Sequence, residues 1–314
     1  MDFFTHSVVG ALLYLLFFKG VTLDYLFLAT FFSILPDLDV FITPLKRVIK
    51  SNYLEHRGGS HSYITGIIIS SLIGSIFSSL RSRPFFIVWL IGSSFYGLHV
   101  SMDLLTTTKI PYLFPLSKKE HSFYVEKAGS FFTMINSLAF IIVLISLHAN
   151  SVDIFFIRLL IDIYTSFFIT YYIYRIVSRV WVSSNLETHQ KYLPGVLPFY
   201  YVIYNYEFRD NEIFLNLQRG SHFSKSREIV KSNYILNSEE KVLFEKGLEF
   251  CKANYYYAKW TLLPTIIRND GVFSVRIFFL ETMMRNRTMF NQVNFGTLTQ
   301  QVLSVNRDSG QIQS

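Results

Sequence analysis

Long apolar runs dominate the first 180 residues of the chain, and a mixture of polar and apolar positions dominates the rest. The runs 62–80, 84–102 and 131–152 contain no Asp, Glu, Lys or Arg, and only the last two contain a histidine. A helix needs about 20 mostly apolar residues to cross the hydrocarbon core of a bilayer. These three runs are therefore predicted to be membrane helices.

Three further segments complete the predicted helical region. Segment 154–174 is apolar apart from an Arg and an Asp four residues apart, which can pair on one helix face. Segments 3–18 and 21–35 are short and are separated by Lys19-Gly20, so they could be two short spans or one re-entrant hairpin. The pattern predicts an all-α polytopic membrane domain of about six helices over residues 1–180.

A small α+β domain is predicted over residues 181–295. Segment 196–206 is aromatic and β-branched, as in strands, and residues 237–240 have the pattern of a capping box that opens a helix of about 15 residues. The dipeptide 270–271, Asp-Gly between two β-rich runs, predicts a hairpin. The polar residues 296–314 are predicted to be a disordered tail.

Composition excludes several classes of protein. The net charge is +7, but no basic stripe with interleaved aromatics is present, so no nucleic-acid partner is expected. The single cysteine, Cys251, cannot form a disulfide within the chain, and nothing indicates an oxidising compartment. The first apolar run lacks a basic leader and a cleavage site, so we expect it to be a retained span.

The distribution of loop charges predicts the orientation. One predicted face carries Lys46, Arg47, Lys50, Arg57, Lys109, Lys118, Lys119 and Lys127, followed by Arg175, Arg179 and Lys191, whereas the other carries Lys19, Arg81 and Arg83. Cytoplasmic loops have an excess of Lys and Arg. We therefore expect an integral protein of the cell membrane, with the richer face and the C-terminal domain on the cytoplasmic side.

A set of polar landmarks falls near span ends on that same face. Its members are His6, Asp37, Asp39, His56, His61, His99 and Asp103. Scattered structural histidines have no reason to share a face, so the placement predicts one shared site. His99 and Asp103 have i,i+4 spacing, which puts both on one helix face, where they could grip one metal ion. The ordinary alternative is a helix-end salt bridge.

The two other motifs also have an ordinary structural explanation beside the functional one. Pro36 ends an apolar run, and Asp37 and Asp39 follow it as reasonable ligands for a cation or as a solvated turn. In the heptapeptide 56–62, two histidines flank Arg57 and a glycine pair just before a helix, where backbone amides and a guanidinium favour an anion. Ser60 or Ser62 can instead serve only as a helix cap.

Together these residues resemble a known family. Thr5-His6 with Gly10, LPDLD at 35–39, HRGGSHS at 56–62 and HVSMDLLTT at 99–107 are similar to the motifs of the YdjM-like family, described as LexA-regulated, membrane-bound, metal-dependent hydrolases. The resemblance covers about residues 1–150. One departure is that Gly129 is followed by Ser-Phe-Phe-Thr, where many members have a glutamate; Glu126 is the candidate substitute.

The resemblance also implies a remote relation to the zinc phospholipase C and nuclease superfamily, whose all-α enzymes cleave phosphoesters with His/Asp-bound zinc. On that relation, His6, Asp37, His56 or His61, His99 and Asp103 are expected ligands, and Asp103 is the expected bridging group. The expected function is a membrane-bound metal-dependent hydrolase acting on phosphoesters or lipids, with Asp37, Asp103 and Arg57 as catalytic residues and a divalent metal, zinc first, as cofactor.

Two other functions remain open at this point. Intramembrane His and Asp also form ion pathways, so a metal-binding membrane protein or transporter without hydrolase activity is the main alternative. A pathway needs ligands near the midplane and on both faces, whereas these cluster on one face. A scaffold that retains the motif without activity is the third, because of the missing acid after Gly129.

Overall fold

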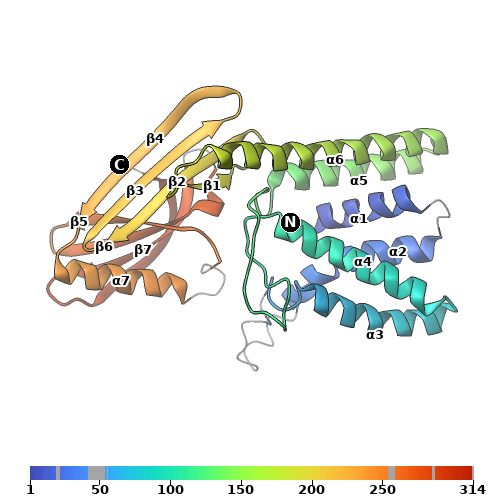
Figure 1. Ribbon diagram of the computed structural model, residues 1–314, viewed down its shortest axis with the longest axis horizontal. Helices are drawn as coiled ribbons and strands as arrows, with labels where there is room; N and C mark the ends of the chain where they lie inside the picture. The colour runs from blue at the N-terminus through green and yellow to red at the C-terminus, as the bar shows by residue number, and fades with distance from the viewer. Residues whose placement is uncertain (19–21, 42–53, 55, 254–258, 285–286, 313–314) are drawn as a thin grey trace. The chain divides into compact units, whose positions relative to one another are not determined.

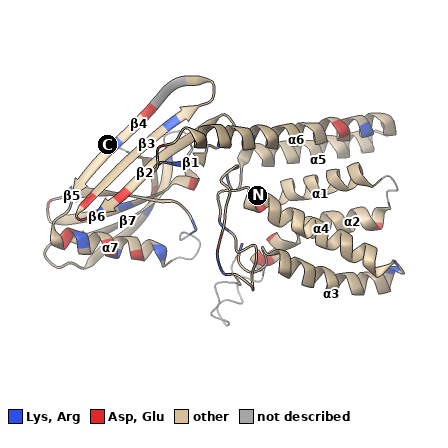
Figure 2. Ribbon diagram, viewed as in Figure 1, with Lys and Arg blue, Asp and Glu red and all other residues tan. Residues whose placement is uncertain are grey.

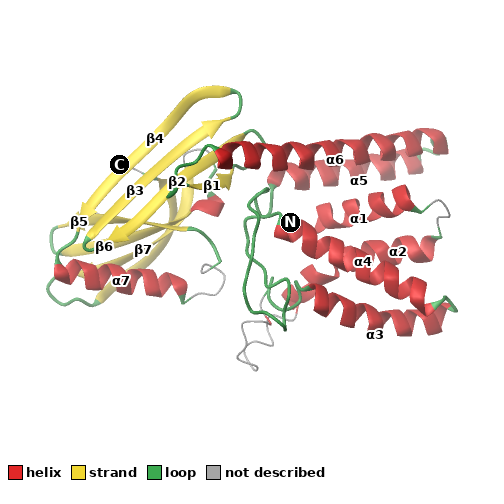
Figure 3. Cartoon of the chain, viewed as in Figure 1, coloured by secondary structure: helices red, strands yellow, loops and turns green. Residues whose placement is uncertain are grey.

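The computed structural model describes residues 1–18, 22–41, 54, 56–253, 259–284 and 287–312, with the backbone alone for 225–227. Lys19, Lys46, Arg47 and Lys50, used in the orientation argument, lie outside these residues. The chain divides into two compact units, Met1–Ile176 and Val177–Ser314. Figure 3 shows that helices make up the first unit and that strands dominate the second.

Seven α-helices form in the described part of the chain, and six of them begin within the first unit. They are α1 (Phe3–Phe17), α2 (Leu23–Ile34), α3 (Tyr63–Arg81), α4 (Phe85–Leu104), α5 (Phe131–Ala149) and α6 (Ile154–Ser184), with the 3-10 helix η1 (Leu35–Phe41) after α2. Only α3, α4, α5 and α6 are long and apolar enough to cross a membrane. Six full spans are therefore not confirmed, because α1 and α2 are too short.

Helix α4 lies at the centre of the unit and packs against α1, α2 and α3, while α1 also packs against α5 (Figure 1). The core between them contains Leu28, Phe32, Val88 and Tyr96, all buried. Charged side chains are sparse along α1–α5 (Figure 2). The outer faces instead expose large apolar side chains, such as Ile76 and Leu80 on α3, as expected for contact with lipid.

Small residues allow α3 and α4 to approach closely. Gly66, Ser70 and Gly74 are buried at i, i+4 and i+8 on α3. A Cβ added at Gly66 would lie 2.4 Å from the ring of Tyr96, whereas at Gly74 the nearest atom would be 3.6 Å away. Stripes of small residues bring helix backbones together in membranes.

We expect Gly66→Ala to destabilise the protein by about 1–3 kcal/mol, because the Tyr96 ring must move out of a packed core. Gly74→Ala is the matched control on the same helix, and it should be neutral or slightly stabilising because the added methyl group meets only ordinary contacts. Thermal unfolding in detergent measures both. Equal unfolding temperatures for the two variants would contradict this packing.

Capping side chains and a proline determine where the helices near the site begin and end. The Asp2 side chain caps α1 by accepting from the Thr5 backbone N–H over 2.9 Å, and the Ser62 side chain caps α3. Pro36 has no N–H to donate, and the chain turns from α2 into η1 there. The N-termini of α1, α3 and α5 and the C-termini of α2, α4 and α6 therefore lie at one end of the bundle (Figure 1).

The second unit contains two four-stranded antiparallel sheets, in the orders β1-β2-β3-β4 and β5-β6-β7-β8. The strands are β1 (Lys191–Pro194), β2 (Tyr200–Arg209), β3 (Glu212–Ser221), β4 (Ser224–Ile235), β5 (Leu262–Asn269), β6 (Val272–Phe279), β7 (Arg287–Gly296) and β8 (Val302–Gln311). Helix α7 (Ser238–Lys252) packs on β6 and β7, with Phe244 and Val275 in the shared core. A short 3-10 helix, η4 (Leu280–Thr282), follows β6.

Two local predictions in this unit are confirmed. Asn237 and Glu240 form the capping box at the start of α7. Asp270 and Gly271 connect β5 to β6 as a hairpin in which Asn269 pairs with Val272. The tail prediction needs a correction, because residues 302–311 form β8, paired with β7 from Arg287 to Phe295. The polar side chains of β8 lie on an edge strand, where an exposed polar face is normal.

Candidate metal centre

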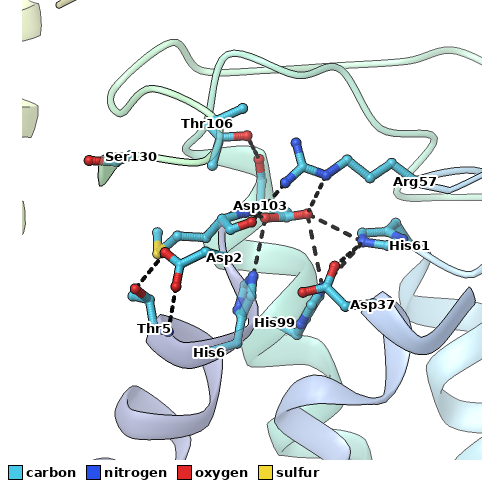
Figure 4. A network of polar contacts seen from close by, with 12 residues as sticks. Asp2, Thr5, His6, Asp37, Arg57, His61, His99, Asp103, Thr106 and Ser130 are labelled. Carbon is cyan, nitrogen blue, oxygen red and sulfur yellow. Dashed lines mark hydrogen bonds and ion pairs between the residues drawn. The ribbon is translucent and has the colours of Figure 1, made fainter. Parts of the chain in front are cut away.

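Four side chains converge at the end of the helical unit where α2 and α4 terminate. Asp37 lies on η1, and His61 immediately precedes the N-cap of α3. His99 and Asp103 lie one turn apart near the end of α4. One ligand atom of each lies within 4.8 Å of the others, and Figure 4 shows the side chains directed toward one another. Apart from the slightly exposed Asp37, all are fully buried.

The hydrogen bonds of the two histidines leave their Nε2 atoms facing each other. His99 Nδ1 donates to the carbonyl of Ser33 over 2.7 Å, so a neutral His99 has its lone pair on Nε2. His61 Nδ1 lies 3.3 Å from the Asp39 carboxylate, which implies the same tautomer. The two Nε2 atoms are 3.2 Å apart. In these tautomers neither can donate to the other, whereas a cation between them would satisfy both.

The carboxylates complete this set of acceptors. Asp103 Oδ2 lies 3.3 Å from His61 Nε2 and 3.9 Å from His99 Nε2, and the corresponding distances from Asp37 Oδ1 are 3.5 and 3.7 Å. Both oxygens are buried and accept no hydrogen bond within the described residues. Ligand atoms on a tetrahedral zinc ion, with bonds of about 2.0–2.1 Å, are about 3.3–3.4 Å apart. The spacing therefore fits a small divalent cation.

Asp39 lies behind His61 and holds it in place. Its Oδ2 accepts from the Arg57 backbone N–H over 3.0 Å and from the Ser60 hydroxyl, and its Oδ1 lies 2.6 Å from His56 Nδ1. Burial raises the pKa of the Asp39 carboxyl, but the contacts with His56 and His61 outweigh burial and lower it. Asp39 is thus an anion that orients a histidine, an arrangement common around metal ligands.

We expect Asp39→Asn to weaken metal binding by about 10–100-fold without abolishing it, as is typical when a partner of a ligating histidine is changed. The amide is nearly isosteric but can present its NH₂ group to His61 Nδ1. Titration of the metal-free protein with Zn²⁺ measures the affinity. An affinity equal to that of the wild type would show that Asp39 does not orient His61.

Arg57 contacts both Asp39 and Asp103. Its backbone is in the left-handed region, with φ at +62°. Its N–H bonds Asp39 while its guanidinium bonds the Met1 carbonyl over 2.9 Å and lies 3.4 Å from Asp103 Oδ2. This buried cation therefore sits beside the group in which Asp103 takes part (Figure 4).

The sequence-predicted residues outside the four-residue group surround it. His6 Nε2 lies 3.2 Å from Asp103 Oδ1, and the His6 ring stacks on His99 with centroids 3.7 Å apart. The Met1 ammonium group contacts the same oxygen of Asp103. His56 contacts Asp39 rather than the shared point.

Glu126 lies elsewhere. Its carboxylate pairs with Arg175 of α6, with Arg175 Nε 2.9 Å from Oε2, and it accepts a hydrogen bond from the Tyr171 hydroxyl. Arg175 is fully buried. The sequence predicted neither the Glu126–Arg175 ion pair nor the hydrogen bond from His99 to the Ser33 carbonyl. Arg175 could have been flagged, because a charge within an apolar helix usually has a partner.

Fold and site together define a polytopic membrane protein with a His/Asp group that could hold a metal ion at one end of its helices. The family model of the YdjM inner membrane protein matches residues 1–182, more than half of the chain. The chain therefore belongs to the YdjM inner membrane protein family, as the motifs indicated, and it is a membrane protein. No curated protein and no solved structure matches it.

Proposed function

We propose that the protein is a membrane-bound metal-dependent hydrolase whose metal is held by Asp37, His61, His99 and Asp103. The observation that carries the proposal is the pair of Nε2 lone pairs facing each other beside two buried carboxylate oxygens that accept no hydrogen bond within the described residues. Two histidines and two carboxylates suit zinc, which is the proposed ion. When bound, a divalent ion lowers the pKa of water and polarises a phosphoryl or carbonyl oxygen.

The surrounding side chains would perform the remaining steps. Asp37 and Asp103 are the candidates to orient and accept a proton from the attacking water, since their carboxylates line the shared point. Arg57 is the candidate to hold an anionic substrate group, because its guanidinium lies beside Asp103. A phosphoester, including that of a lipid, fits a site at the ends of membrane helices where a bound divalent cation would lie beside Arg57. His6, Asp39 and His56, also predicted as ligands, would hold these ligands in place.

Orientation is part of the proposal. The site and the C-terminal end of α6 lie at the same end of the helical unit, because Tyr172 of α6 contacts Met1 beside Asp103. The excess of Lys and Arg in the loops at this end favours the cytoplasmic side. We therefore propose that the site and the strand domain both face the cytoplasm.

A metal-binding protein or transporter without hydrolysis is the second candidate. Buried His and Asp would suit it, but the converging ligands all lie at one end of the helices, and a route across the membrane needs further ones. Placement therefore favours a reaction site over a pathway.

Hydrolysis by the full chain in lipid nanodiscs separates the two candidates. The probes are bis(p-nitrophenyl) phosphate and a phospholipid, each with zinc-loaded and metal-free protein. We expect zinc-dependent turnover that is lost in Asp103→Asn and retained in Asp24→Asn, whose carboxylate pairs with Arg83 instead of contributing to the His/Asp group. Stoichiometric zinc without turnover of either probe would support the non-hydrolytic alternative.

A further inference from the structure

Three segments that are distant in the sequence form an aromatic edge on the strand domain. The ring of His222, in the β3–β4 turn, lies 6.0 Å from that of Trp181 on α6 and 5.0 Å from that of Tyr201. The His222 N–H donates to the Phe199 carbonyl over 3.0 Å. We define the aromatic edge as Trp181, Leu197, Phe199, Tyr200 and Phe223.

This edge exposes an unusual amount of apolar surface. Phe223 is 81% exposed, Trp181 57%, Tyr200 48% and Leu197 43%. Phe199 packs against Phe223 and Tyr200, with ring centroids 5.8 and 4.9 Å apart, and His222 links Trp181 to the Phe199 backbone, so these rings form one patch. Contiguous exposed apolar patches mark binding surfaces.

Helix α6 carries the edge out of the membrane. It has 31 residues, so it is about 46 Å long, whereas the hydrocarbon core is about 30 Å thick. Arg175 is paired with Glu126 at the end of the helical unit that bears the metal centre. Trp181 follows six residues later, about 9 Å along the helix axis. The headgroup layer on each side of the bilayer is about 5–8 Å thick. With the hydrocarbon core ending at Arg175, Trp181 therefore lies at the outer boundary of the headgroup layer.

The composition of the edge also matches that layer. Trp and Tyr concentrate at membrane–water interfaces because their rings are apolar and their N–H or O–H groups are polar. Arg179 on α6 and the exposed Lys191 at the start of β1 add positive charge that suits anionic headgroups. Continuity with a membrane span is the reason to prefer lipid to a second protein as the partner.

We propose that the aromatic edge lies in the headgroup layer of the bilayer and holds the strand domain against the membrane surface. The proposal is independent of the reaction at the metal centre, since no residue of the edge belongs to the His/Asp group.

Spin labels in the full chain test the proposal. Cys251 is the only cysteine and is buried, so Cys251→Ser gives a background for single labels at Phe223→Cys, Leu197→Cys and Leu298→Cys. Leu298, in the β7–β8 turn, is 97% exposed and has no place in the edge, which makes it the matched control. Each labelled protein is reconstituted in nanodiscs of phosphatidylethanolamine and phosphatidylglycerol, after thermal unfolding has shown that it is folded.

Collision rates with oxygen and with a water-soluble nickel chelate measure the depth of each label. We expect the oxygen-to-nickel ratio at 223 and 197 to exceed that at 298 several-fold, and doxyl lipids to broaden the first two spectra only. Adding Tyr200→Asp should return the label at 223 toward the value at 298. Equal ratios at all three positions would overturn the proposal, and so would a label at 223 that is shielded from nickel but not broadened by doxyl lipid.

Discussion

Replacing Arg175 by methionine should destabilise the helical unit by about 3–5 kcal/mol, because it leaves the Glu126 carboxylate buried without its cation. Both side chains are at most 1% exposed, so water cannot replace the lost partner. Glu126 also anchors the loop after α4, since its N–H donates to the Leu105 carbonyl over 2.9 Å. The loss should therefore appear as a large fall in the unfolding temperature in detergent.

The same helix offers a control. Arg158 pairs with Asp162 over 3.5 Å, but both are more than half exposed rather than enclosed by the protein, so Arg158→Met should destabilise the protein less than Arg175→Met does. The double variant Glu126→Gln/Arg175→Met removes both charges, and it should be less destabilised than the sum of the two single variants. Additive effects would show that the pair is not coupled.

Removing metal should produce the second large effect. A ligand that binds only the folded state stabilises it by about 4 kcal/mol at a free concentration 1,000 times its dissociation constant. Without a cation, the Asp37 and Asp103 oxygens face two imidazole lone pairs with no donor between them. We therefore expect a chelator to lower the unfolding temperature of the wild type and added Zn²⁺ to restore it.

Two aspartate variants show whether the loss of stability on metal removal comes from the His/Asp group. Asp103→Asn should unfold at the same temperature with and without chelator, because a required ligand is missing. Asp24→Asn should respond to chelator as the wild type does, since Asp24 pairs with Arg83, away from the His/Asp group. A wild type whose unfolding temperature is unaffected by chelator and by Zn²⁺ would contradict the assignment.

The sequence predicted the helices of the first unit well, because charge-free runs and terminal signals are local. The helix expected at 62–80 forms at Tyr63–Arg81, and that expected at 84–102 forms at Phe85–Leu104. Spacing within α4 likewise predicted that His99 and Asp103 share a face. The six predicted spans are not all confirmed, because α1 and α2 are apolar but short.

The roles of neighbouring residues could not be read from the sequence. Asp37 and Asp39 are two residues apart, yet Asp37 joins the group while Asp39 contacts His56 and the back of His61. That division depends on the path of η1 and on the left-handed backbone at Arg57. The pair of Glu126 and Arg175 spans 49 residues, so no local pattern could predict it.

Metal content of the detergent-purified protein, measured by mass spectrometry beside the His99→Ala/Asp103→Ala variant, tests the central claim most directly. The structure predicts a stoichiometric divalent ion in the wild type that is absent from the variant, because the variant removes half of the converging ligands. If neither protein holds metal after supplementation, while both remain folded, the His/Asp group is not a metal centre and the proposed hydrolase is contradicted.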